Sequence, residues 1–259
     1  MMPTIQIGAH TLVFYSIFNA AAFCACLICN LCFVLRECDL LKEHSTLLCG
    51  RLKGKDPEVV ALFVLLFLTI AQYAIGVIAS MSFGNLFSNG YINYFGNIYS
   101  LLLIAAVLAL VRIDPLRQLD LIVPAHAVSL VFFKLACFMA GCCHGKEWAH
   151  GWYFVRNQRY EFPSQLLEML VAVLIAIILV RALRKGLYTG KLHAMYLLLY
   201  SATRFFTEFT REGNVVFAGL QPYQLQCLIT LVIGLTEWFL VEKFGSNLSI
   251  SKRKTVTGR

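Results

Sequence analysis

Two long stretches of this chain contain no Asp, Glu, Lys or Arg. The first runs from the N-terminus to Leu35 and the second from Val59 to Val111. A helix that crosses a bilayer needs about 20 apolar residues, so the first stretch can hold one such helix and the second can hold two. Charged residues make up 14% of the chain and apolar residues 59%, whereas soluble domains have roughly 25% charged residues. The sequence therefore predicts an integral membrane protein and excludes a nucleic-acid binder with a basic face.

Apolar segments bounded by charged residues or by Gly and Pro predict about seven membrane spans. They lie near 11–35, 58–80, 97–112, 119–141, 163–182, 191–210 and 222–242. Of the 22 Lys and Arg residues, 16 fall in segments on one side of these spans. The positive-inside rule makes that side cytoplasmic, which places the N-terminus outside and the C-terminus inside. We expect one all-α membrane domain over 1–245 and a basic, disordered cytoplasmic tail at 246–259.

The predicted span at 191–210 ends in a stripe of charge. Arg204, Glu208 and Arg211 fall at positions i, i+4 and i+7, which share one face of a helix. A charge near the bilayer centre costs about 2.5–3.5 kcal/mol, so such residues usually serve a function. A guanidinium can bind a phosphate with two hydrogen bonds, and two arginines around one glutamate leave a surplus positive charge. The stripe favours an anionic ligand, and the alternative is an ion pair that docks this helix on a neighbour.

The predicted span at 119–141 carries a cation of its own. Lys134 lies about fourteen residues into this span, so it should face other protein or a water-filled cavity. Gly141 and Gly145, near the end of the span, permit a sharp exit from the helix or a close approach of two backbones.

Two thiols and an imidazole follow the same span, as Cys142, Cys143 and His144. A nucleophile with its base, part of a metal site and a redox pair all fit this group, and so does a structural role. Two thiols and one imidazole are an incomplete set of metal ligands, with no obvious fourth ligand in the sequence. No metal and no other cofactor are therefore predicted.

The span at 163–182 opens with Pro163 and carries Gln165 and Glu168 in its first turns. Pro suits the first turn of a helix, and polar residues three apart point the same way. Because polar residues at the entrance of a span are often helix caps, this segment alone is a weak indication of function.

Taken together, these segments resemble one family, the bacterial prolipoprotein diacylglyceryl transferases. One helix of that family begins Pro-Ser-Gln-Leu-Tyr-Glu, and residues 163–168 match it except for Leu167 in place of Tyr. A later family helix carries Phe-Arg-x-x-x-Glu-Phe-x-Arg, and residues 204–211 match every defining position after the first. Tyr15, seven residues after an Ile-Gly pair, resembles the family's functional Tyr, and Gln224 resembles the Gln of its Gly-Gln motif. The motifs occur in the family's order over nearly the whole chain.

The chain also departs from the family pattern. In the signature Gly-Arg-x-x-Asn-Phe-x-Asn-Gly, Lys134 replaces the Arg, and Cys137 and Ala140 replace the two Asn residues. Phe95 takes the place of the His in the family's His-Gly-Gly motif. The positive charge of the signature is kept, but the imidazole usually proposed as the catalytic base is missing. The chain resembles a divergent branch or a paralogue with another acceptor.

The resemblance implies that a diacylglyceryl group is transferred from phosphatidylglycerol to the lipobox cysteine of a prolipoprotein, with release of glycerol phosphate, in the bacterial cytoplasmic (inner) membrane. Arg204, oriented by Glu208, would stabilise the departing phosphate. The residues expected to bind the substrate are Lys134, Arg211, Tyr15, Gln165 and Gln224. With the family's His absent, the further catalytic candidates are His144 as the base, or Cys143 or Cys142 as a first acceptor of the lipid group.

Three other functions fit the same residues. An enzyme of the same fold could use phosphatidylglycerol with a glycan, a small molecule or another peptide as acceptor. A transporter could use the charged stripe as a transient site for an anionic lipid, and would form no covalent product. A non-catalytic membrane protein could bind the lipid without turnover.

Overall fold

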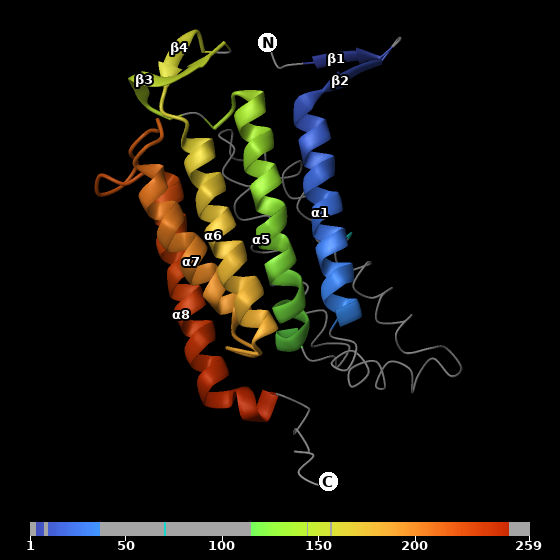
Figure 1. Cartoon of the computed structure of the whole chain (residues 1–259). Coiled ribbons are helices and arrows are strands. Elements are labelled where there is room, and N and C mark those ends of the chain that lie inside the picture. Colours follow the sequence, from blue (N-terminus) through green and yellow to red (C-terminus); the bar gives the residue numbers. More distant parts are fainter. Residues whose placement is uncertain are drawn as a thin grey trace.

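A computed structural model of the chain describes residues 4–7, 10–36, 70, 115–143, 145–155 and 157–248. This part of the chain is mostly helical (Figure 1). Its helices are α1 (Phe14–Arg36), α5 (Pro115–Ala140), α6 (Ser164–Arg184), α7 (Leu192–Glu208) and α8 (Pro222–Leu248). Its strands form two antiparallel pairs, β1 (Thr4–Ile7) with β2 (His10–Val13) and β3 (Glu147–Phe154) with β4 (Arg159–Glu161).

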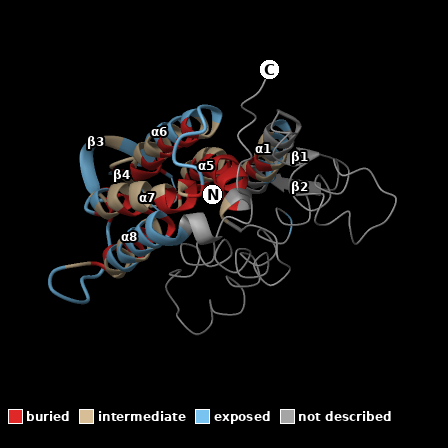
Figure 2. Ribbon diagram, turned by 90° about the horizontal axis from the view of Figure 1, so that it is seen from below, coloured by how far each residue is buried: buried red, intermediate tan, exposed pale blue. Residues whose placement is uncertain are grey.

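The helices pack side by side, with α5 at the centre. Helix α5 contacts α1, α6 and α7, while α8 packs on α7. Both strand pairs lie at one end of the bundle, and the C-terminal end of α8 lies at the other (Figure 1). Buried residues gather around α5, whereas α8 turns an exposed face outward (Figure 2).

Three of the described helices are long and apolar enough to cross a membrane. They cover Leu119–Ala140, Ser164–Arg184 and Pro222–Phe244. The outward surfaces of α6 and α8 carry large exposed apolar side chains, such as Leu174 and Phe239, which a membrane would cover. The spans predicted at 119–141, 163–182 and 222–242 coincide with these helices.

The other predicted spans have different outcomes. Those at 11–35 and 191–210 correspond to α1 and α7, although residues 11–13 belong to strand β2 and the helix begins only at Phe14. The spans predicted at 58–80 and 97–112 lie outside the described residues, apart from Ile70. The two strand pairs are an addition to the all-α prediction. Each is a short antiparallel hairpin, β1–β2 immediately before α1 and β3–β4 between α5 and α6.

A buried carboxylate sets the position of α7 against α5. Asp120, in the second turn of α5, accepts hydrogen bonds from the backbone N–H groups of Gly190 and Leu192, the latter at 3.0 Å. These N–H groups lie at the start of α7, where a helix has no partners of its own for its first donors. The carboxylate therefore ties one end of α7 to α5. This fixes how far along the bundle Arg204 lies relative to Lys134.

Candidate functional site

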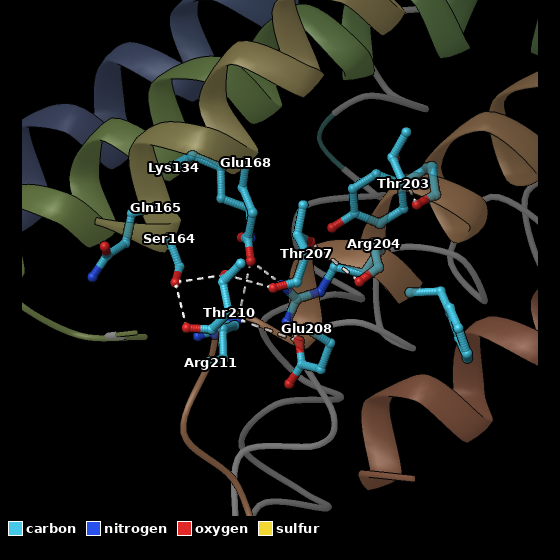
Figure 3. A network of polar contacts seen from close by, with 12 residues as sticks. Lys134, Ser164, Gln165, Glu168, Thr203, Arg204, Thr207, Glu208, Thr210 and Arg211 are labelled. Carbon is cyan, nitrogen blue, oxygen red and sulfur yellow. Dashed lines mark hydrogen bonds and ion pairs between the residues drawn. The ribbon is translucent and has the colours of Figure 1, made fainter. Parts of the chain in front are cut away.

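Five charged side chains, four from three helices and one from the segment after α7, converge in the interior of the bundle (Figure 3). Lys134 comes from α5, Glu168 from α6, and Arg204 and Glu208 from α7, while Arg211 follows the end of α7. All five are buried, none with more than 9% of its surface exposed. We call these residues the ionic cluster. The structure thus brings together the cations that the sequence analysis placed on separate helices.

Glu168 lies at the centre of the ionic cluster. Its carboxylate forms ion pairs with Lys134 and Arg204, and one of its oxygens lies 3.3 Å from Nη1 of Arg211. One acid therefore faces three buried cations. In the sequence, Glu168 is only a polar residue at the start of a span, and the predicted site does not include it. Its match to the Glu of the Pro-Ser-Gln-Leu-Tyr-Glu motif was the signal that could have identified it.

Glu208 is the second acid of the ionic cluster. Its Oε2 forms an ion pair with Nη2 of Arg204 at 2.7 Å and lies 3.9 Å from Nη1 of Arg211. Arg204 is therefore held between two carboxylates, and its guanidinium lies over the ring of Tyr223, 5.5 Å from the centroid. With three cations and two acids, the cluster keeps a net positive charge. Among the described residues, Arg211 forms its ion pairs through Nη1 only.

The end of α5 brings two thiols together. Gly141 has a φ of 61°, and its N–H donates to the carbonyl of Phe138, while the N–H of Cys142 donates to the carbonyl of Cys137 at 3.1 Å. These two hydrogen bonds define a Schellman motif, in which the second residue beyond the helix lies against a residue of its last turn. Cys142 and Cys137 are that pair. The expected sharp exit at Gly141 is confirmed.

Cys143 completes a group of three thiols. The Sγ atoms of Cys137, Cys142 and Cys143 all lie within 4.8 Å of one another. Hydrogen bonds from the other two thiols, together with the charges of Arg211 and Lys134, hold the pKa of the Cys143 thiol well below its usual range. In the sequence, Cys137 stands out only as the replacement of an Asn of the family signature. His144 lies outside the described residues, so its proposed role as a base remains a prediction.

The segment after α5 packs on the first turn of α6 and on the end of α7. Nε2 of Gln165 donates to the carbonyl of Cys142 at 2.6 Å, and the N–H of Lys146 donates to the carbonyl of Thr210 at 2.9 Å. These contacts place the three thiols beside the ionic cluster. Oε1 of Gln165 is buried and has no hydrogen-bond partner in the described part of the chain. It is a buried acceptor that the described residues leave unsatisfied.

The remaining predicted binding residues lie at helix starts. The amide of Gln224 is buried at the beginning of α8, where its Oε1 accepts from the N–H of Gln221 at 2.9 Å and its Nε2 donates to the carbonyl of Phe205 at 3.4 Å. Gln224 therefore helps to fix α8 against α7. Tyr15 is the second residue of α1, and its side chain lies outside the described part. Binding of substrate by either residue remains a prediction.

Replacing Gly145 with alanine should disrupt the packing of the thiol segment. An added Cβ would lie 2.2 Å from the carbonyl oxygen of Phe162 and 2.6 Å from Oγ of Ser164, distances that require the backbone to move. We expect a lower midpoint of thermal unfolding in detergent. Gly186→Ala is the control, because its Cβ meets nothing within 4 Å and only its positive φ is strained, at about 1–2 kcal/mol. Equal melting of the two variants would contradict the close approach at Gly145.

Comparison with known proteins adds an independent observation. A family model described as prolipoprotein diacylglyceryl transferase matches residues 3–240. A phosphatidylglycerol–prolipoprotein diacylglyceryl transferase of Clostridium tetani is 32% identical over 132 residues, which are 47% of this chain and 52% of that protein. Another, numbered 2, of Clostridium perfringens is 29% identical over 155 residues, 57% of this chain and 60% of that protein.

These matches are partial in length. A protein of the same name from Chlorobaculum tepidum is 30% identical over 133 residues, 48% of this chain and 46% of that protein. The chain spans about half the length of the curated relatives it matches. The family model, in contrast, covers nearly the whole chain, including the ionic cluster and the thiols. The chain therefore belongs to the prolipoprotein diacylglyceryl transferase family.

Proposed function

We propose that this protein is a membrane-embedded transferase that moves a diacylglyceryl group from phosphatidylglycerol to the thiol of a lipobox cysteine. The observation that carries this proposal is the convergence of three buried cations on two buried acids. The surplus positive charge lies within the bundle and fits an anionic phosphate. The names of the bacterial relatives give the substrate class that this charge would meet.

The reaction needs positive charge where the phosphate leaves. The carbon–oxygen bond between the diacylglyceryl group and the phosphate breaks, the oxygen keeps the electron pair, and a carbon–sulfur bond forms to the acceptor. The thiol proton passes to a base, and glycerol phosphate is released. Preorganised cations in a site that lipid keeps dry stabilise the charge that develops on the phosphate oxygen.

The ionic cluster supplies these cations from fixed positions. Arg204, held between Glu168 and Glu208, faces the phosphate, and Arg211 uses the guanidinium nitrogens outside its Nη1 ion pairs to receive the headgroup. Lys134 is the second cation at the departing oxygen. Oε1 of Gln165 accepts a hydrogen bond from a glycerol hydroxyl.

Two further residues extend the site at its edges. We assign Tyr15 and Gln224 to the lipid headgroup, since each lies at the start of a helix that packs into the same bundle. The protein is placed in the bacterial cytoplasmic membrane as a single domain over 1–245, with about seven spans, the N-terminus outside and the C-terminal tail inside. The distribution of Lys and Arg supports this orientation.

The acceptor side of the reaction is assigned to the segment after α5. Replacing Cys142, Cys143 and His144 together with alanine should abolish transfer to a lipobox peptide, because the base or first lipid acceptor would be lost. Release of glycerol phosphate and lipidation of the peptide are measured in the same reaction. A Cys24→Ala variant, changed at an exposed thiol of α1, is the matched control. Full transfer by the triple variant would remove this segment from the chemistry.

The function itself is tested with purified protein, labelled phosphatidylglycerol and a synthetic lipobox peptide. Released glycerol phosphate that depends on the peptide supports the proposal. Release without peptide indicates an enzyme with a different acceptor. Movement of the lipid across a vesicle membrane without any product indicates a transporter and overturns the transferase proposal.

A further inference from the structure

The three thiols at the end of α5 have the arrangement of a metal-ligand set. Their Sγ atoms lie within 4.8 Å of one another. Three thiolates bound to one Zn²⁺ at about 2.3 Å lie about 3.8 Å apart in tetrahedral geometry. A small contraction therefore converts the observed group into a coordination site. This comparison does not depend on the proposed transferase reaction.

The backbone holds the thiols in this arrangement before any metal binds. The Schellman motif fixes Cys137 against Cys142, through the hydrogen bond of 3.1 Å between their backbone groups. Cys143 has a φ of 58°, a left-handed conformation that costs a non-glycine residue about 1–2 kcal/mol. The surrounding packing maintains this conformation, and it keeps the third thiol beside the other two. A metal ion would therefore meet a preorganised set of ligands and not a flexible loop.

The positive charges around the thiols determine how many thiolates a bound dication needs. Lys134 and Arg211 lie close enough for their charges to act on Cys143, and they would repel a bare dication. A dication bound by three thiolates carries a net negative charge, which the same two residues attract. The site therefore needs all three thiols as ligands. Loss of any one should weaken binding strongly.

We propose that Cys137, Cys142 and Cys143 bind one thiophilic divalent cation, for which Zn²⁺ is the best match. Soft thiolate ligands select Zn²⁺ over Mg²⁺, Ca²⁺ and Mn²⁺. Three protein ligands leave the fourth tetrahedral position for water or a substrate atom, as in catalytic zinc sites. A disulfide would use only two of the thiols and would exclude the metal.

The proposal is tested on the full chain in detergent, reduced and handled without oxygen. Co²⁺ serves as the probe, because thiolate-bound tetrahedral Co²⁺ has an intense charge-transfer absorption, and Zn²⁺ is then used to displace it. We expect one equivalent to bind and the absorption to disappear on addition of Zn²⁺. We expect Cys143→Ser, which replaces an exposed thiol, to lower the affinity for Co²⁺ by more than about 100-fold. This exceeds the loss caused by removing a residue that only hydrogen-bonds to a metal ligand.

The matched control is Cys227→Ser, which changes a buried thiol on α8. It should bind Co²⁺ like the unchanged protein, whereas Cys137→Ser should not. Equal binding by all variants would overturn the proposal, as would a wild-type titration without charge-transfer absorption. A disulfide between any two of the three thiols in the protein isolated without oxygen would also overturn it. The titration contains no phosphatidylglycerol and the phosphate-release assay contains no added metal, so failure of the metal site and failure of the transferase reaction are told apart.

Discussion

Glu168→Gln should lower the rate of lipid transfer by at least about 100-fold, the scale of losing one preorganised electrostatic contact. The glutamine keeps the size of the side chain but removes the charge that Lys134, Arg204 and Arg211 share. Removing one partner of a buried ion pair costs about 3–5 kcal/mol, because the remaining charge is left uncompensated. We therefore also expect a lower midpoint of thermal unfolding. Transfer is measured as released glycerol phosphate.

Two comparisons separate the loss of activity from the loss of stability. Glu242→Gln removes an exposed acid whose ion pair with Lys191 spans 3.2 Å, and it should change neither property, since such surface pairs contribute little. Combining Glu168→Gln with Lys134→Met removes one of the uncompensated cations. This double variant should regain part of the lost stability but none of the activity. Normal transfer by Glu168→Gln would show that the acid is not needed to organise the cations.

Arg204→Lys should be nearly as severe, although it keeps the positive charge. The guanidinium reaches Glu168 with Nη1 and Glu208 with Nη2, and a single ammonium cannot occupy both positions or present a planar pair of donors to a phosphate. We expect a fall in transfer of at least about 100-fold, with a smaller change in thermal stability than for Glu168→Gln. Arg184→Lys, at an exposed position in the last turn of α6, is the matched control. If Arg204→Lys transfers lipid normally, bidentate binding of the phosphate is wrong.

The helices of the fold could be predicted from local patterns in the sequence. Apolar length alone located α5, α6 and α8, and charge periodicity placed Arg204 and Glu208 on one face of α7. The strand pairs were not predicted in this way, because strands of three to eight residues contain no apolar segment long enough to indicate a span. Contacts between distant segments could not be predicted from local patterns either, such as the hydrogen bond from the N–H of Lys146, which follows α5, to the carbonyl of Thr210, at the end of α7.

The same distinction applies to the site. Lys134 was recognised because a cation inside an apolar span is costly wherever it points. Glu168 was underestimated because its three partners come from two other elements, and no spacing within its own helix reveals them. The hydrogen bonds at the end of α5 place Cys137 beside Cys142 and Cys143. The family motif has Asn at this position, so it does not indicate a group of three thiols.

Glu168 follows Lys134 in the sequence, and this order affects how the helices enter the membrane during synthesis. Lys134 is synthesised before its acidic partner, so α5 would enter lipid with an unpaired ammonium, at a cost of about 2.5–3.5 kcal/mol on insertion scales. Helices α6 and α7 are joined by a short turn, residues 185–191, and can insert as a hairpin with Glu168 and Arg204 already neutralising each other. Arrival of this hairpin gives Lys134 its acidic partner and removes this cost. A ribosome stalled before α6 would thus leave α5 in the bilayer with this energetic cost uncompensated.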